Sequence, residues 1–92
     1  MITKQTVLIC DGGLHARPAS DFVACAKTFQ CAVTIRNLDK PERPATNAKS
    51  IMRVLAEGIS SGTNIEIGAD GADEQEAIDA LIALVDSHFG EA

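Results

Sequence analysis

The sequence predicts an α+β domain in which one antiparallel sheet is covered on one face by helices. Short segments that alternate apolar and polar residues, as half-buried strands do, are interspersed with segments whose apolar residues recur every three or four positions. A chain of 92 residues is too short to build two hydrophobic cores. We therefore expect residues 1–92 to form a single domain.

The first half of the chain predicts a strand, a helix and a second strand. Residues 2–9 contain a β-branched, apolar run, which the glycine-rich turn at residues 11–13 ends. Residues 16–29 have the spacing of an amphipathic helix. Residues 31–36 alternate between apolar and polar side chains, as a half-buried strand does. The buried face of the helix is expected to carry Ala19, Phe22, Val23, Ala26 and Phe29.

The middle of the chain predicts a weak strand and a short helix. Pro41 and Pro44 confine their segment to a loop or to an edge strand, because proline cannot donate a backbone hydrogen bond. Thr46 or Asn47 can cap a short helix that runs to about residue 57 and ends at Gly58.

The final third predicts a strand at residues 63–68 and a long amphipathic helix. Asp73 and two glutamates occupy the first turn of that helix, where carboxylates stabilise the positive helix end. Gly90 is expected to end it. Its buried stripe is predicted to be Ala77, Ile78, Leu81, Ile82, Val85 and Phe89.

Charge is distributed unevenly along the chain. Residues 1–53 contain all eight lysines and arginines with four acids, a net charge of +4, whereas residues 54–92 contain nine acids and no base, a net charge of −9. This asymmetry suits an anionic partner for one face. Nucleic acid is excluded as that partner, since the acidic part opposes a polyanion and the chain has no Trp or Tyr for base stacking.

Composition also bears on compartment and cofactors. The longest apolar stretch, residues 77–85, is too short to cross a bilayer, so we expect no membrane insertion. The first ten residues lack the features of a signal peptide, which predicts a cytoplasmic protein. The three cysteines form no CxxC motif, so we expect reduced thiols and neither a metal nor a cofactor.

The candidate functional residues lie in the segment Gly13-Leu14-His15-Ala16-Arg17-Pro18-Ala19. His15 stands between a glycine-rich turn and a helix start, where free amides, the positive helix end and Arg17 create an anion site. That environment predicts a His15 pKa below about 6.5, hence a neutral, nucleophilic ring. A phosphoryl group on the ring would be stabilised by the same amides. The alternative is that His15 is only a helix-cap residue.

The sequence resembles the HPr family, the histidine-containing phosphocarriers of the bacterial phosphoenolpyruvate-dependent sugar phosphotransferase system. The resemblance covers about residues 7–89 and is carried by three motifs, at residues 13–19, 49–52 and 71–74. It implies an open-faced sandwich of four antiparallel strands and three helices. It also implies that His15 accepts a phosphoryl group on Nδ1 from phospho-enzyme I and passes it to enzyme IIA-type domains, while Arg17 binds that group.

Two branches of the family remain open. Residues 38–48 form a longer segment than in the commonest members, and residues 37–39 with 44–45 resemble the carrier domain of fructose-inducible phosphotransfer proteins. Residues 82–85 with Phe89 are instead similar to the nitrogen-branch relative, NPr.

Ser50 aligns with the serine that a dedicated HPr kinase phosphorylates in some bacteria. The alternative is a serine that caps the following helix. Around it we expect an apolar docking patch with a positive rim, because Ile51 and Met52 cannot both face inward. We expect the protein to be a monomer, and its predicted docking residues are Ser20, Ala24, Lys27, Lys49, Ile51, Met52 and Arg53.

A small acylphosphatase-like hydrolase on a similar frame is the competing enzyme hypothesis. Such an enzyme needs an arginine in a glycine-rich phosphate loop, and residues 11–13 supply none. Turnover of acetyl phosphate would favour the hydrolase, and a stable, acid-labile phosphohistidine would favour the carrier.

Overall fold

The sheet is antiparallel throughout and follows the strand order β1-β4-β2-β3. The computed structural model describes residues 1–10, 12–14 and 16–90. Within those ranges the strands are β1 (Ile2–Leu8), β2 (Ala32–Asn37), β3 (Thr46–Asn47) and β4 (Thr63–Asp70). The helices are α1 (Ala16–Lys27), α2 (Ile51–Ala56) and α3 (Glu74–Asp86), followed by the short 3-10 turn η1 (His88–Gly90).

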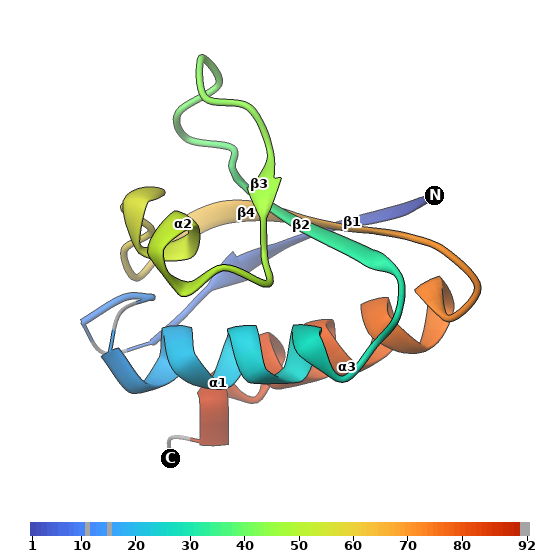
Figure 1. The fold of residues 1–92 in the computed structure, drawn as a ribbon. Coiled ribbons are helices and arrows are strands. Elements are labelled where there is room, and N and C mark those ends of the chain that lie inside the picture. The colour runs from blue at the N-terminus through green and yellow to red at the C-terminus, as the bar shows by residue number, and fades with distance from the viewer. Residues whose placement is uncertain (11, 15, 91–92) are drawn as a thin grey trace.

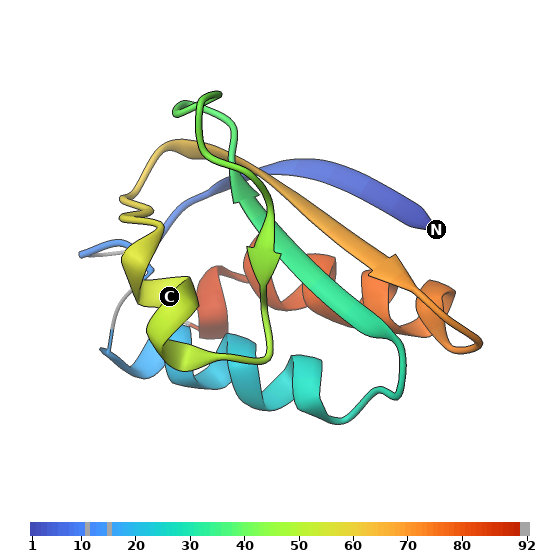
Figure 2. The ribbon, with the colours of Figure 1, turned by 45° about the horizontal axis from the view of Figure 1, so that its top comes forward.

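The helices lie on one side of the sheet and leave its other face open. α1 and α3 run side by side beneath the sheet, and α3 packs on β1 and β4 (Figure 1). α2 lies at one end of the sheet, next to β3 and to α1 (Figure 2). This arrangement confirms the predicted α+β sandwich.

Strand alternation sorts apolar from polar side chains between the two faces. Ile35 pairs with Ile67 across β2 and β4, and both side chains are fully buried against the helices. On the open face, Glu66 lies between Gln5 and Arg36 in the strand register. The largest fully buried apolar side chains are Phe22, Leu8, Ile35, Ile65, Ile67, Ile78, Leu81, Val33, Val54 and Val85.

β3 is a two-residue edge strand, as the two prolines that precede it predicted. Thr46 and Asn47 pair with β2 only, and both prolines lie in the loop before them. The prediction that Thr46 or Asn47 caps the short helix is wrong. Ser50 caps α2 instead, and its Oγ accepts the Arg53 backbone N–H at 3.4 Å.

Both long helices end earlier than their apolar spacing predicted. α1 ends at Lys27 rather than Phe29, and the Thr28 hydroxyl donates to the Cys25 carbonyl at 2.7 Å. α3 ends at Asp86, so the prediction that Gly90 ends it is wrong. His88 and Phe89 both have a φ of 56°, a left-handed conformation that an α-helix cannot contain.

The turn between β4 and α3 is locked to the start of β2. A Cβ on Gly71 would lie 2.7 Å from the Cys31 Cβ, so only glycine fits at this position. The Asp73 carboxylate accepts the backbone N–H groups of Gln30 at 2.8 Å and Cys31 at 2.9 Å. These bonds, led by the one from Gln30, lower the pKa of Asp73, whereas burial and then the contact with Asp73 raise the pKa of the Cys31 thiol.

Candidate functional site

The turn before α1 is built on two left-handed glycines. Gly12 and Gly13 have φ values of 79° and 81°, which other residues rarely adopt. The Gly13 N–H donates to the Cys10 carbonyl at 2.8 Å and closes the turn. The predicted phosphoryl acceptor, His15, lies outside the described residues, and the turn ends one residue before it.

A second segment, residues 59–61, supports this turn. The Leu14 N–H donates to the Ile59 carbonyl at 2.8 Å, and the Leu14 side chain is buried. The Cys10 N–H donates to the Ser61 hydroxyl at 3.3 Å. A Cβ on Gly13 would lie 2.7 Å from the Ile59 carbonyl oxygen, so the two backbones touch. Leu14, the residue before His15, is therefore held in a fixed position.

The start of α1 supplies positive potential and backbone strain. Its first turn contains Arg17 and Pro18 and no acidic side chain, so the positive helix end is not neutralised locally. Ala16 has a φ of 46°, a left-handed conformation that costs a non-glycine residue about 1–2 kcal/mol. Such strain persists where the surrounding structure imposes it, and it concentrates at functional sites.

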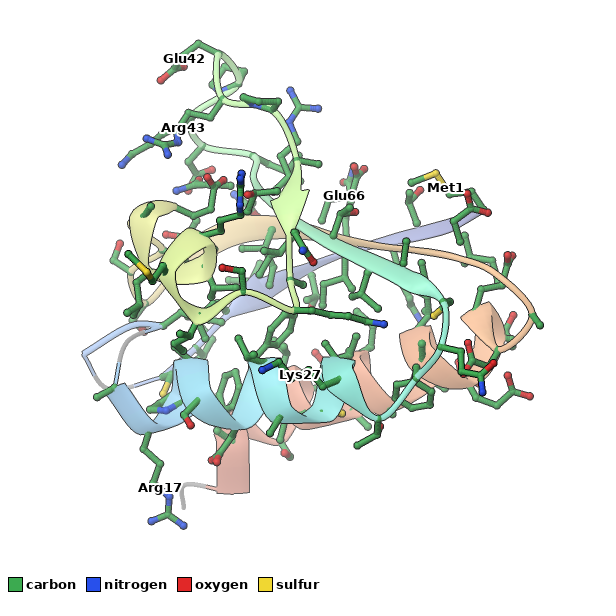
Figure 3. All side chains as sticks on the ribbon, in the orientation of Figure 1. Met1, Arg17, Lys27, Glu42, Arg43 and Glu66 are labelled. Carbon is green, nitrogen blue, oxygen red and sulfur yellow. The ribbon has the colours of Figure 1, made fainter. Side chains whose placement is uncertain are left out.

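Arg17 extends into solvent from the start of α1. Its side chain is 91% exposed, and Nε lies 3.8 Å from the Asp21 carboxylate one helical turn later. Figure 3 shows this side chain pointing away from the rest of the molecule. An exposed ion pair of this length contributes little to stability, so the guanidinium is free to reorient.

The structure brings four of the predicted docking residues together between α1 and α2. Ser20, Ala24, Lys27 and Ile51 line a pocket of about 250 Å³, to which Val23 adds an apolar wall. Arg17 does not line it. The outer face of α1 and the start of α2 therefore form one surface.

α2 presents an apolar patch to solvent. Ile51 is 37% exposed, Met52 is 77% exposed and Leu55 is 45% exposed. The prediction required one of the first two side chains to face outward, and both do. Leu55 was missed, although its spacing of three and four residues from the other two places it on the same helix face.

The predicted positive rim is only partly free. The Lys49 ammonium donates to the Phe29 carbonyl at 2.7 Å and ties the start of α2 to the end of α1. The side chains of Lys27 and Arg53 are exposed. Lys27 of α1 and Arg53 of α2 can therefore contact a partner without first breaking a hydrogen bond.

The described part of the chain holds no group of three or more His, Cys, Asp or Glu side chains that could bind a metal ion. Among the same residues, no helix is long and apolar enough to cross a membrane.

Comparisons with known proteins cover almost the whole chain. The family model for the PTS HPr component phosphorylation site matches residues 2–87. Phosphocarrier protein HPr of Haemophilus influenzae is 38% identical over 85 residues, which span 92% of this chain and 95% of the relative. Phosphocarrier protein NPr of Proteus mirabilis is 44% identical over 79 residues, which span 86% of this chain and 84% of the relative.

A solved structure agrees in fold. HPr-C-His from Thermoanaerobacter tengcongensis superposes with a TM-score of 0.92 at 38% sequence identity, and the match covers 100% of this chain and 99% of the other. The superposition therefore spans the glycine turn, the start of α1 and α2.

Proposed function

Because the chain belongs to the HPr family of phosphocarrier proteins of the phosphotransferase system, we propose that its phosphoryl group is carried on His15. A ring nitrogen of His15 attacks the phosphorus on phospho-enzyme I, and the bond from phosphorus to the donor breaks as the new N–P bond forms. An enzyme IIA-type domain then takes the group, and His15 is regenerated. The protein is thus a carrier and not a turnover enzyme.

The observation that carries this proposal is the anchored turn in front of the positive end of α1. The hydrogen bond from Leu14 to Ile59 fixes the residue before His15. The first turn of α1 begins at Ala16, the residue after His15. The first turn of α1 carries no acidic side chain, so the amides at this helix end favour a transferred anion. Arg17, with its exposed guanidinium, is proposed to bind the phosphoryl oxygens.

The α1–α2 surface is proposed as the docking site for enzyme I and for IIA-type domains. Its apolar patch supplies contact area, and Lys27 and Arg53 favour an acidic partner face. We further propose that residues 1–92 act as a monomeric single domain in the cytoplasm. An HPr kinase that phosphorylates Ser50 would add negative charge to this surface, at a hydroxyl that already caps α2.

The test is to incubate the protein with enzyme I and labelled phosphoenolpyruvate and to locate the label. His15→Ala should abolish labelling, whereas His88→Ala, which changes the other histidine of the chain, should leave it unchanged. The label should be lost in acid, as expected for phosphohistidine. Labelling of the His15→Ala variant would overturn the assignment, and turnover of acetyl phosphate would favour a hydrolase instead.

A nitrogen-branch, NPr-like carrier is the second candidate, favoured by the 44% identity to the Proteus mirabilis protein. The two branches are separated by comparing transfer from the sugar-branch enzyme I and from the nitrogen-branch donor under equal conditions. Faster transfer from the nitrogen-branch donor would assign the chain to that branch.

A further inference from the structure

α2 carries the proposed docking surface but is weakly anchored by its own side chains. The helix has six residues, and Val54 is the buried one among them. A helix this short does not form in water without tertiary support. Its orientation must therefore be set by contacts at its two ends.

The C-terminal end of α2 is held by an ion pair between a buried carboxylate, on Glu57, and the partly exposed guanidinium of Arg43. Glu57 follows the last helical residue, and its side chain is 4% exposed. Nε and Nη2 of Arg43 both lie 3.3 Å from the Glu57 Oε2 atom. The Asn37 side-chain amide also donates to the Glu57 backbone carbonyl at 3.3 Å. Arg43 and Asn37, both from outside the helix, thus hold the end of α2 in place.

Arg43 is an obligate partner for this carboxylate. Within the described part of the chain, the buried Oε1 atom of Glu57 has no hydrogen-bond partner. A buried carboxylate is costly unless it is paired, and here its pairing comes from Arg43. The cost of burying the Glu57 carboxylate therefore favours the loop conformation in which the Arg43 guanidinium contacts it.

The loop that delivers Arg43, residues 38–45, is itself fixed to the sheet. Arg36 of β2 donates to the Arg43 carbonyl at 3.2 Å and to the Pro41 carbonyl at 3.0 Å. At the loop's other end, Asp39 accepts the side-chain amide of Asn64 in β4 at 3.1 Å. In Figure 3 the loop rises above α2, with Glu42 at its far end and Arg43 closer to the helix. The loop is a brace from the sheet to α2.

We infer that Arg43 and Glu57 are positioning residues for partner recognition, which orient the exposed side chains of α2 toward enzyme I. The inference rests on the proposed function, in which α2 docks that donor. Loss of the brace should weaken docking, while the transfer step itself, which takes place at the start of α1, should be preserved. In kinetic terms, KM for this protein rises and kcat stays the same.

The experiment compares Arg43→Met, the double variant Arg43→Met/Glu57→Gln and Arg43→Lys with the wild type. Arg43→Met leaves a buried charge unpaired and should lower Tm by about 8 °C or more. It should raise the KM of enzyme I for this protein about tenfold, with kcat unchanged within about twofold. Arg43→Lys retains a donor for the single Oε2 atom and should recover most of the lost affinity.

The double variant separates positioning from stability. It removes the unpaired charge, so Tm should recover, but the brace is still missing and KM should stay high. If KM recovers together with Tm, or if Arg43→Met leaves KM unchanged, the inference is overturned. Lys4→Met, which removes an exposed cation from β1, is the matched control and should change neither quantity.

Docking is also measured by calorimetric titration of unphosphorylated enzyme I. Failure of the wild type to bind would overturn both this inference and the proposed docking surface. Labelling at a residue other than His15 would overturn the proposed acceptor alone, since the brace acts on binding.

Discussion

Replacing Gly13 with alanine tests whether the acceptor turn is fixed by contact with residues 59–61. The added Cβ would lie 2.7 Å from the Ile59 carbonyl oxygen and 2.8 Å from the Ser60 Cα. Both are backbone atoms, so no side-chain rotation can relieve the overlap. One of the two segments must move, and the hydrogen bond from Leu14 to Ile59 must lengthen or break.

The size of the effect follows from two separable costs. At a φ of 81°, alanine is disfavoured by about 1–2 kcal/mol. Overpacking against fixed atoms adds about 1–3 kcal/mol. Gly62 provides the matched control, because its φ is 90° and an added Cβ would meet no atom within 4 Å. Gly62→Ala should therefore incur only the first cost.

The assay is thermal and urea unfolding of both variants beside phosphoryl transfer from enzyme I. At about 4–8 °C per kcal/mol, the first cost of about 1–2 kcal/mol should lower the Tm of Gly62→Ala by roughly 4–16 °C, and the summed cost of about 2–5 kcal/mol should lower the Tm of Gly13→Ala by roughly 8–40 °C. At a temperature where both remain folded, Gly13→Ala should slow transfer about tenfold or more, because small displacements at a reacting group are costly. Gly62→Ala should transfer normally. Equal losses of stability, or normal transfer by Gly13→Ala, would refute the proposed contact.

Three further predictions concern single side chains. Arg17→Ala should slow transfer at least about tenfold yet change stability by less than about 0.5 kcal/mol, because the side chain is almost fully exposed; equal transfer rates would exclude its role. Ser50→Ala should lower the unfolding free energy by about 1 kcal/mol, because the helix cap is lost. Ser50→Asp should keep the cap and raise the KM of enzyme I for this protein. An unchanged KM for Ser50→Asp would show that Ser50 acts only as a helix cap. Asp73 has a lowered pKa in the folded protein, so its contribution is fully present above the unfolded-state pKa of about 3.9 and is lost as pH falls through the folded value. Asp73→Asn should therefore flatten the loss of stability between about pH 5 and pH 2. If urea unfolding shows the same loss of stability below about pH 5 in Asp73→Asn as in the wild type, Asp73 does not contribute to the pH dependence.

Much of the fold was predictable because periodicity reports how each segment is buried. The stripe from Ala77 to Val85 and the alternation of Ile65 and Ile67 both describe the observed core. The limits of the elements were less predictable. Apolar spacing continues to Phe89, yet α3 ends at Asp86 because His88 and Phe89 adopt positive φ, which the spacing does not encode.

For the functional site, local sequence chemistry specified the glycine turn, the proline in the first helical turn and the apolar pair on α2. Those features depend on neighbours within a few residues, so the sequence by itself determined them. The support of Gly13 by Ile59 and the pairing of Arg43 with Glu57 join residues far apart in the chain. Only the tertiary structure decided these contacts, because a close backbone approach or an ion pair to a buried carboxylate exists only once folding has brought both partners together.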